Sequence, residues 1–384
     1  MRVAIDYTTA IAQGAGIGRY VRCLVEALIA LDSSSQYELL ACGRSAQELP
    51  FPSRPNVEVR HIFLPDRHWF RWQLPFYSRY FSGPVDIYHG PNFALPSLKK
   101  TLRKIVTIHD LAYLEYPQYV PPATRSYLNA VVPAAIAEAD VVVAVSHSVA
   151  RALNQYYRVP REKIAVIPNG VGTRFRHVTD PIPLEETRRK FGLHAPFVLS
   201  VGTLEPRKNH LGLIKAFTQV REQRADVVLA LAGDEGWLYE ETRQIVTKLK
   251  LEGRVRFLGR VSEDELVALY NMAEIFAFPS FYEGFGIPPL EAMACGAPVI
   301  TSNMSSLPEV VGDAALMLDP YDIDAIAASI SHLLEDRELR ESLRQKGYER
   351  ARSYSWHNAA SKMLSVYRRL YNGETVFGDE VELS

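Results

Sequence analysis

The chain has 384 residues, of which 47% are hydrophobic and 23% charged. This length exceeds what one hydrophobic core usually supports, and the composition is that of a folded globular protein, which argues against disorder. The 43 Lys and Arg residues are balanced by 44 Asp and Glu residues, so the overall charge does not indicate a nucleic-acid partner, which would need a basic face.

Short runs rich in β-branched residues alternate with helical patterns in both halves of the chain. This alternation is typical of βαβ units and predicts an α/β protein with two doubly wound, Rossmann-like parallel-sheet domains. In the first half we expect strands at residues 3–5, 39–41, 57–59, 85–88, 105–108, 141–145 and 164–167. In the second half we expect strands at residues 197–201, 227–231, 255–258, 275–278 and 299–301.

We expect a first domain over residues 1–171, a linker over 172–190, and a second domain over 191–357. The linker is rich in Pro, Thr and charge and shows no sustained period, as a domain boundary should.

Neither a signal peptide nor a membrane span is predicted. The first apolar run, residues 3–5, ends at Asp6, and the most hydrophobic region, 130–145, falls short of the roughly 20 apolar residues that a membrane helix needs. Three widely spaced cysteines, at positions 23, 42 and 295, have no metal-binding spacing and favour reduced thiols in the cytoplasm.

Glycines at positions 14, 16 and 18 follow the first strand. They alternate as G-x-G-x-G and not as the dinucleotide pattern G-x-G-x-x-G, and the second strand ends without an acid for a ribose. We interpret Gly14, Gly16 and Gly18 as a loop that faces an interdomain cleft, with a flexible strand-to-helix turn as the alternative. Residues 67–81 mix aromatic and basic side chains without an acid, which suits a helix that covers the core or a peripheral membrane contact.

His109 ends a strand that should be buried, and Asp110 follows it. This position puts an imidazole at the cleft edge of the first domain, although a single histidine is more often structural. Ser146, directly after the strand at 141–145, is expected to cap a helix that begins near His147.

The run 200–209 reads as strand, glycine turn at Gly202, and helix from about Asn209. Arg207 offers a forked guanidinium and Lys208 a mobile ammonium, a combination that suits the two phosphates of a diphosphate. Both lie beyond the carboxyl end of a strand, where open parallel sheets bind their ligands. The alternative is an ordinary surface charge pair.

The most informative stretch is residues 283–291, which places Glu283 and Glu291 on either side of a glycine turn that opens a helix. Gly284 and Gly286 allow the backbone to approach a ligand closely, and the free amides of the helix start favour an anion. Glu283 is then placed to accept hydrogen bonds from a sugar, and Glu291 to reach a ribose diol. The alternative is a tight turn with solvated acids.

These motifs together resemble the retaining glycosyltransferases of family 4, over nearly the whole chain. The likeness rests on the Glu pair at 283 and 291, the Glu-Pro-Arg-Lys-Asn run at 205–209, the strand end at 259–261, and, more weakly, the segments 6–20 and 107–111. Within the family, the segments Gly-Ile-Gly-Arg-Tyr (16–20) and Ile-His-Asp-Leu (108–111) are similar to segments of bacterial mannosyltransferases of polysaccharide and O-antigen assembly.

The resemblance implies a fold of the GT-B type, a last helix at about 358–384 that returns to the first domain, and retention of anomeric configuration. It also implies that His109 contacts the transferred sugar and that the backbone near Arg260 and Val261 contacts the base. The predicted catalytic residues are Glu283, His109, Arg207 and Lys208. The predicted donor-binding residues are Gly14, Gly16, Gly18, Gly202, Arg207, Lys208, Gly233, Arg260, Val261, Glu283, Gly284, Phe285, Gly286 and Glu291.

The sequence therefore predicts a hexosyltransferase that uses a nucleotide diphosphate sugar, with GDP-mannose as the best candidate, and a glycan or lipid-linked acceptor. Arg207, Lys208 and the amides near Phe285 and Gly286 would stabilise the leaving diphosphate, and domain closure would exclude water. No metal or other cofactor is expected, since the cations replace a divalent ion. The expected location is the cytoplasm or the inner face of its membrane. A nucleotide-sugar epimerase and a catalytically silent sugar-binding subunit remain as alternatives.

Overall fold

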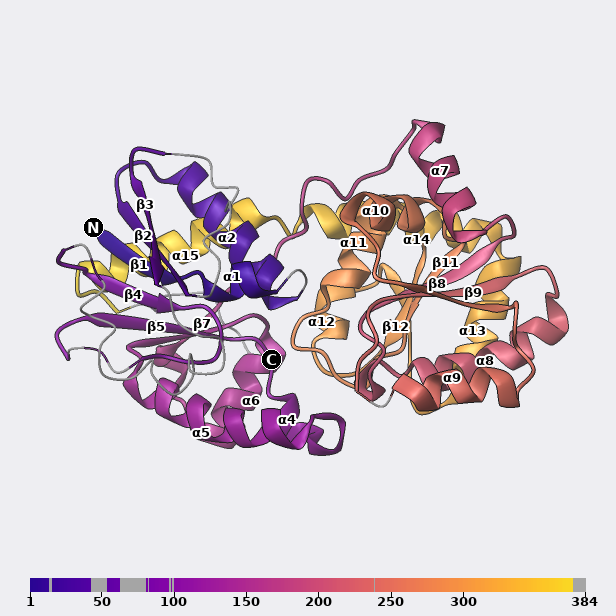
Figure 1. The fold of residues 1–384 in the computed structure, drawn as a ribbon, viewed down its shortest axis with the longest axis horizontal. Helices are drawn as coiled ribbons and strands as arrows, with labels where there is room; N and C mark the ends of the chain where they lie inside the picture. The colour runs from indigo at the N-terminus through magenta and orange to yellow at the C-terminus, as the bar shows by residue number, and fades with distance from the viewer. Residues whose placement is uncertain are drawn as a thin grey trace. The chain divides into compact units, whose positions relative to one another are not determined.

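The computed structural model describes residues 1–13, 16–42, 54–62, 81, 83–96, 98, 100–237 and 239–375. The chain divides into two compact units (Figure 1). Unit 1 comprises Met1–Tyr113, Pro122–Gly170 and the residues from Trp356 onward, and unit 2 comprises Leu114–Pro121 and Val171–Ser355.

The described part of unit 1 contains a seven-stranded sheet in which all neighbouring strands are parallel. Its strands are β1 (Arg2–Asp6), β2 (Gln36–Cys42), β3 (Val57–Ile62), β4 (Ile87–Gly90), β5 (Arg103–Ile108), β6 (Val141–Ala144) and β7 (Ile164–Val166). The order β3-β2-β1-β4-β5-β6-β7 reverses direction between β1 and β4, which is the topological switch point of this sheet. The residues that follow β1, β4 and β5 therefore share one edge.

Helices cover both faces of this sheet. They are α1 (Thr8–Ala12), α2 (Ile17–Leu31), α4 (Ala112–Glu115), which crosses the division at Tyr113, α5 (Pro122–Glu138), α6 (His147–Tyr157) and α15 (Trp356–Tyr371), with a 3-10 turn η4 (Arg161–Lys163). In Figure 1, α2 and α15 lie on one face, and α5 and α6 on the other. Helix α2 buries Tyr20, Leu24 and Leu28, one residue per helical turn, and packs against α15.

Unit 2 contains a six-stranded parallel sheet in its described residues. Its strands are β8 (Phe197–Val201), β9 (Val228–Ala232), β10 (Val255–Gly259), β11 (Ile275–Phe278), β12 (Val299–Ser302) and β13 (Ala315–Leu318). The order β10-β9-β8-β11-β12-β13 reverses between β8 and β11, so the switch point of unit 2 lies between these two strands.

The helices of unit 2 are α7 (Pro181–Phe191), α8 (His210–Gln223), α9 (Tyr239–Lys248), α10 (Glu263–Met272), α11 (Ile287–Cys295), α12 (Leu307–Val311), α13 (Ile323–Glu335) and α14 (Arg337–Arg352), with 3-10 turns η3 (Pro117–Tyr119) and η5 (Pro206–Lys208). Helix α8 buries Leu213, Phe217 and Val220 in the core of the unit, which also contains Leu229 and Ile275 from the sheet. This packing fixes the start of α8 at the carboxyl edge of the sheet.

The fold class is confirmed: both units are doubly wound parallel sheets, and each of the twelve expected strands overlaps an observed one. Two observed elements were not among those expected from the sequence. The segment 172–190 contains a helix, α7, which begins with Asp180 as its cap and Pro181 in its first turn. Strand β13 was missed because its sequence, Ala-Leu-Met-Leu, has no β-branched residue to distinguish it from a helix.

Two further expectations concern membranes and caps. Among the helices that the structure describes, none is long and apolar enough to cross a membrane. Most of the aromatic and basic segment 67–81 lies outside the described residues. The cap expected at Ser146 is confirmed, since its hydroxyl accepts a hydrogen bond from the Val149 amide (3.1 Å) at the start of α6.

Candidate active site

The switch point of unit 2 brings two distant segments together. The turn η5, with Arg207 and Lys208, follows β8, and the loop that contains Glu283 follows the neighbouring strand β11. The backbone joins them directly, because the Phe281 amide donates to the Arg207 carbonyl (2.9 Å). Residues about 75 positions apart in the sequence are therefore held side by side at the edge where parallel sheets bind ligands.

Glu283 is 7% exposed and lies between two cations. Its Oε1 accepts a hydrogen bond from Lys208 Nζ at 2.6 Å, and its Oε2 accepts one from Arg207 Nη1 at 3.1 Å. Arg207 also donates from Nη1 to the Tyr282 carbonyl (2.8 Å) and from Nη2 to Glu205 Oε1 (2.6 Å). Two cations and two carboxylates thus form one closed cluster, which we call the ion cluster: Glu205, Arg207, Lys208 and Glu283.

The electrostatics keep this buried carboxylate charged. Burial raises the pKa of Glu283, but the charges of Lys208 and Arg207 and the hydrogen bond from Lys208 outweigh it, and the net pKa is lowered to about 2. Burial lowers the pKa of Lys208, and the Glu283 charge opposes that effect. The Lys208 ammonium also lies 5.0 Å from the centre of the Phe278 ring, where a cation is attracted to the aromatic face.

The loop between Glu283 and α11 is held by serine side chains. The Glu283 amide donates to Ser305 Oγ (2.9 Å), while the single hydroxyl proton of Ser306 is shared between the carbonyls of Glu283 (2.8 Å) and Phe285 (2.7 Å). Gly286 precedes α11 with φ of +111°, a conformation that favours glycine, and a Cβ there would lie 2.8 Å from Leu307 Cδ2. The backbone of this turn is therefore fixed at the start of a helix.

Glu291 lies in the second turn of α11, as expected, and is 2% exposed. Its Oε2 accepts a hydrogen bond from the Tyr270 hydroxyl at 3.3 Å. Arg260 follows β10 with a side chain that is 67% exposed and 3.9 Å from Asp234. The contacts of Glu291 with a ribose and of Arg260 and Val261 with a base stay predictions.

Two glycines of the predicted donor site serve close packing. A Cβ at Gly202 would contact the Lys208 side chain at 3.4 Å, so this turn lies against the ion cluster. A Cβ at Gly233 would lie 2.0 Å from the Gly202 carbonyl oxygen, which leaves no space for any side chain. The turns after β8 and β9 therefore touch through these two residues.

The remaining predicted residues lie in unit 1. His109 follows β5 and is buried; its Nε2 donates to the Pro91 carbonyl at 2.8 Å, and its ring meets Tyr20 edge-to-face at 4.6 Å. Burial lowers the pKa of His109 to about 4, so the ring is neutral near pH 7. With its proton on Nε2, the ring offers only Nδ1 as a hydrogen-bond acceptor.

The glycine loop of unit 1 is described in part. Gly14 lies outside the described residues. Gly16 precedes α2 with φ of +59° and has open space around its Cα, whereas a Cβ at Gly18 would lie 2.0 Å from the Gln13 carbonyl oxygen. Gly18 is therefore required for the packing of α1 against α2, and Gly16 is the glycine that leaves space at the helix start.

Sequence reasoning missed a row of stacked aromatic rings beside the ion cluster. Tyr116 stacks on Tyr119, Tyr119 on Phe281, and Phe281 on Tyr321, with ring centres 5.9, 5.3 and 4.7 Å apart. Tyr321 is 56% exposed. The rings come from three separate segments, so no spacing in the sequence indicates them.

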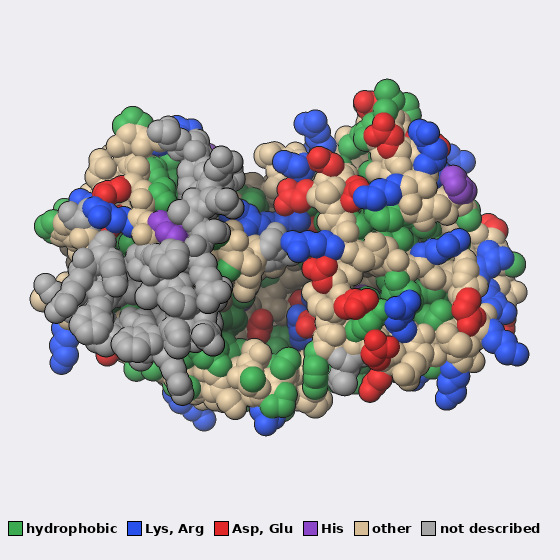
Figure 2. Space-filling view, viewed as in Figure 1, with side chains coloured by type: hydrophobic (Ala, Val, Ile, Leu, Met, Phe, Trp, Pro, Cys, Tyr) green, Lys and Arg blue, Asp and Glu red, His purple; other side chains and the backbone are tan. Residues whose placement is uncertain are grey.

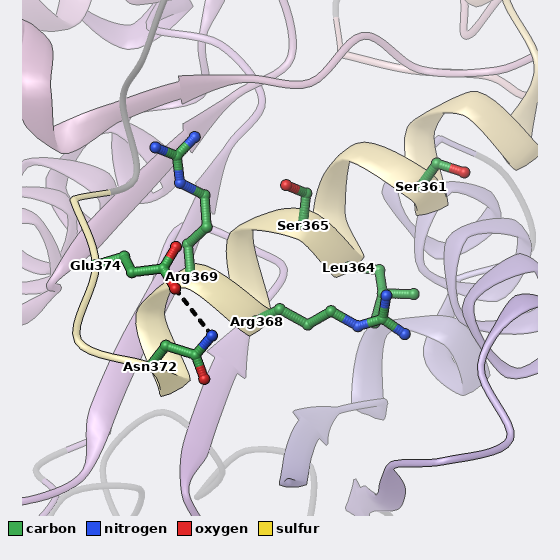
Figure 3. Close-up of a pocket in the computed structure, with 7 residues that line it drawn as sticks. All are labelled: Ser361, Leu364, Ser365, Arg368, Arg369, Asn372 and Glu374. Atoms are coloured by element: carbon green, nitrogen blue, oxygen red, sulfur yellow. Dashed lines mark hydrogen bonds between the residues drawn. The ribbon is translucent and has the colours of Figure 1, made fainter.

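One pocket of 320 Å³ lies along α15 of unit 1 and is lined by residues of that helix together with Asn372 and Glu374 (Figure 3). Figure 3 shows that Arg368 and Arg369 point in different directions, so they do not converge on one ligand. Lys, Arg, Asp and Glu side chains are interspersed over the described face of unit 2 that Figure 2 shows. Within the described ranges, no group of three or more His, Cys, Asp or Glu side chains is placed to hold a metal ion.

Comparisons with known proteins identify the family of this chain. The family described as Glycosyl transferases group 1 matches residues 184–350, and Glycosyltransferase Family 4 matches residues 14–175. The chain is 36% identical to the O-antigen chain mannosyltransferase B of Escherichia coli over 321 residues, which cover 82% of this chain and 80% of that protein.

Solved structures show the same fold at low sequence identity. Sucrose-phosphate synthase from Thermosynechococcus elongatus has a TM-score of 0.76 at 22% identity and covers 97% of this chain and 100% of that one. Anabaena HepE in complex with UDP and glucose has a TM-score of 0.70 at 19% identity, with 96% and 99% covered.

Two doubly wound parallel-sheet units give this chain a fold of the GT-B type. Its chemistry is that of a hexosyltransferase. The chain belongs to glycosyltransferase family 4, as its motifs indicated.

Proposed function

We propose that this protein is a retaining mannosyltransferase that transfers mannose from GDP-mannose to a glycan or lipid-linked acceptor during assembly of a cell-surface polysaccharide. The mannose assignment is supported by the similarity to an O-antigen mannosyltransferase. A nucleotide-linked donor is supported by the similarity in fold to a protein solved with UDP and glucose.

The observation that carries the proposal is the ion cluster at the switch point of unit 2. Without a donor, the two cations Arg207 and Lys208 are neutralised by Glu205 and Glu283. A diphosphate brings negative charge to cations that are already fixed in place. The Lys208 ammonium has three N–H donors and uses one for Glu283, so it can bond a phosphate oxygen without leaving its position.

In the proposed reaction the bond between the anomeric carbon and the diphosphate oxygen breaks, and its electron pair stays on the phosphate. Arg207, Lys208 and the amides near Phe285 and Gly286 stabilise this growing negative charge. The acceptor hydroxyl forms the new bond on the same face of the sugar and gives its proton to a leaving phosphate oxygen. Glu283 accepts hydrogen bonds from the hexose, Glu291 from the ribose, and the neutral His109 from the transferred sugar through Nδ1.

We also propose that no metal ion or other cofactor takes part, because the two fixed cations supply the charge that a divalent ion would supply. Transfer should then continue at the same rate after dialysis against EDTA, and added Mg²⁺ or Mn²⁺ should not raise it. A rate that falls with EDTA and recovers with either ion would refute the metal-independent mechanism.

The test of the function has two stages. Thermal shift with GDP, UDP and ADP and their sugar conjugates should show the largest stabilisation with the guanosine ligands, because a ligand stabilises a fold according to its affinity. GDP-mannose should then release GDP slowly alone and faster with a mannose-terminated acceptor, and NMR of the product should show the α anomer of the donor retained. A product with the inverted anomer would refute the retaining mechanism. An epimerised donor would support a nucleotide-sugar epimerase, and no turnover of any donor would support a catalytically silent subunit.

We place the reaction on the cytoplasmic side of the membrane. None of the three cysteines, all of which the structure describes, forms a disulfide, which supports a reducing compartment. Cell fractionation of the full chain tests this location, and recovery of the protein outside the cytoplasm and its membrane would exclude it.

A further inference from the structure

Asp6 occupies the switch point of unit 1, and the donor chemistry proposed above makes no use of it. It is the last residue of β1, and Ile5 pairs with His89 of β4, so Asp6 lies beside the end of β4. His109 follows the next strand and donates to the Pro91 carbonyl just after β4. Two strand spacings, about 10 Å, therefore separate the Asp6 and His109 positions along one edge of the sheet.

The hydrogen bonds of Asp6 hold its carboxylate in one orientation. Its Oδ1 accepts from the Thr8 amide at 3.0 Å, and the Thr8 side chain donates a second bond. Thr8 Oγ1 itself accepts from the Cys42 amide at 3.2 Å, which leaves the hydroxyl proton for Asp6. A carboxylate has about four acceptor positions, so about two remain beyond those that Thr8 uses.

Among the described residues, no cation balances the charge of Asp6. No Lys, Arg or His of the described chain lies within 4.0 Å of its carboxylate, although the residue is half-buried. Burial raises the pKa of the Asp6 carboxyl. Burial and, second, the Asp6 charge raise the pKa of the Tyr127 hydroxyl from α5.

One further polar contact joins the segments that follow β1 and β4. Asn92 follows β4, and its Nδ2 donates to Thr9 Oγ1 at 3.0 Å, which ties the segments after β1 and β4 together. A carboxylate with open acceptor positions on a rigid sheet edge matches the hydroxyl donors of a sugar ring.

We propose that Asp6 is a binding residue for the acceptor sugar, whose hydroxyls donate hydrogen bonds to its carboxylate at the switch point of unit 1. This inference rests on the proposed mannosyl transfer for the identity of the sugar. It assigns the acceptor to the polar edge of unit 1, whereas the donor diphosphate is assigned to the ion cluster of unit 2.

The test uses Asp6→Asn, because an asparagine Oδ1 can still accept from the Thr8 amide while the charge and half of the acceptor capacity are lost. The matched control is Asp86→Asn. Asp86 is also half-buried and accepts a backbone hydrogen bond, from Arg2 N at 2.7 Å, but it precedes β4 at the opposite edge of the same sheet. The acceptor probe is octyl α-D-mannopyranoside.

With GDP-mannose as donor, Asp6→Asn should lower kcat/KM for the octyl mannoside about 10- to 100-fold, through a higher KM, because a hydrogen bond to a charged group is lost. GDP release from GDP-mannose without an acceptor should stay within about twofold of wild type. Saturation-transfer NMR, which needs no turnover, should show contact between the mannoside and the wild type that disappears in Asp6→Asn and persists in Asp86→Asn.

The proposal is overturned if folded Asp6→Asn keeps the wild-type kcat/KM and NMR contact, if Asp86→Asn loses as much, or if the mannoside makes no contact with the wild type. Failure of the proposed function has a different signature. In that case the wild type releases no GDP from GDP-mannose with or without the mannoside, whatever the NMR contact shows.

Discussion

Glu283 shows how a buried carboxylate becomes a fixed part of the ion cluster. Its desolvation would favour the neutral acid, but hydrogen bonds from Arg207 and Lys208 keep it ionised. Removing one member of such a set leaves a buried charge without its partner, which costs more than the pair contributes. The geometry of the cations and the charge of the carboxylate are therefore linked at this site.

Arg207→Ala and Lys208→Ala should each weaken the donor complex. Each removes charge-assisted hydrogen bonds of about 1.5–3 kcal/mol, which corresponds to about a tenfold or larger fall in kcat/KM for the donor. Lys215→Ala is the control, because Lys215 is an exposed residue of the adjacent helix α8. Steady-state kinetics on folded variants decide, and a wild-type kcat/KM in either would show that these cations do not hold the diphosphate.

Glu283→Gln should separate donor binding from transfer. Without the carboxylate, Arg207 and Lys208 keep their positive charge and lose a competitor, so GDP should bind at least as tightly as to wild type. Transfer should fall at least about tenfold, since the hexose loses its charged acceptor. Isothermal titration with GDP and a transfer assay measure the two effects, and unchanged transfer would assign Glu283 a purely structural role.

Above pH 4.5, the choice of pH matters little for the comparison of Glu283→Gln with wild type. The pKa of Glu283 is lowered to about 2 from a usual 4.5, so the stability that its ionisation contributes is present above pH 4.5 and is lost as the pH falls through about 2. A change in activity near neutral pH therefore cannot arise from titration of Glu283.

At the scale of elements, both sheets reverse their strand order at one point, and each reversal places polar residues at a common edge. In unit 2 the turns after β8 and β9 meet so closely that Gly202 and Gly233 are in backbone contact. This contact sets the position of the chain that leads into η5, and thus of Lys208.

Gly233→Ala should destabilise unit 2 and weaken donor binding. The new Cβ would lie 2.0 Å from the Gly202 carbonyl oxygen, so the two turns must separate, at a cost of about 1–3 kcal/mol. Gly253→Ala is the matched control, because Gly253 also has positive φ (+82°) but nothing within 4 Å of its Cβ position. Urea unfolding measures the loss in free energy of unfolding for both variants. Equal losses would mean that the backbone conformation alone, and not the contact with Gly202, causes the destabilisation.

Elements with a strong local signal were predictable, and those without one were not. The caps at Ser146 and Asn209 and the glycine turn before α11 follow from residue type and spacing. Strand β13 depends on pairing with β12, because its own residues favour a helix as much as a strand.

At the scale of the whole molecule, buried neutral histidines make stability depend on pH. Burial lowers the pKa of His89 and of His210 to about 3 and that of His109 to about 4. The unfolded chain protonates its histidines near pH 6.5, so their contribution to stability is full above that pH and is lost as the pH falls toward the native values. Each of these histidines should lower the free energy of unfolding by about 2 kcal/mol between pH 7 and pH 5.

His210→Leu should reduce this pH dependence by about 2 kcal/mol. Nδ1 of His210 has no hydrogen-bond partner among the described residues, so an apolar side chain of similar size is tolerated there. Urea unfolding at pH 7 and pH 5 measures the difference, with the exposed His194→Gln as control. If His210→Leu loses as much stability on acidification as wild type, His210 is not held neutral in the folded state.

The amino-acid sequence by itself determined the two doubly wound units, nearly all of their strands, and the residues of the proposed nucleotide-sugar site. These features follow from local periodicity, glycine positions and helix caps, which depend on residues close in the chain. Only the tertiary structure decided that Lys208 and Arg207 pair with Glu283, that four aromatic rings from three segments stack beside them, and that Asp6 lies at the other switch point. Strand order sets these contacts, and it is chosen by the packing of the whole sheet, which no local pattern specifies.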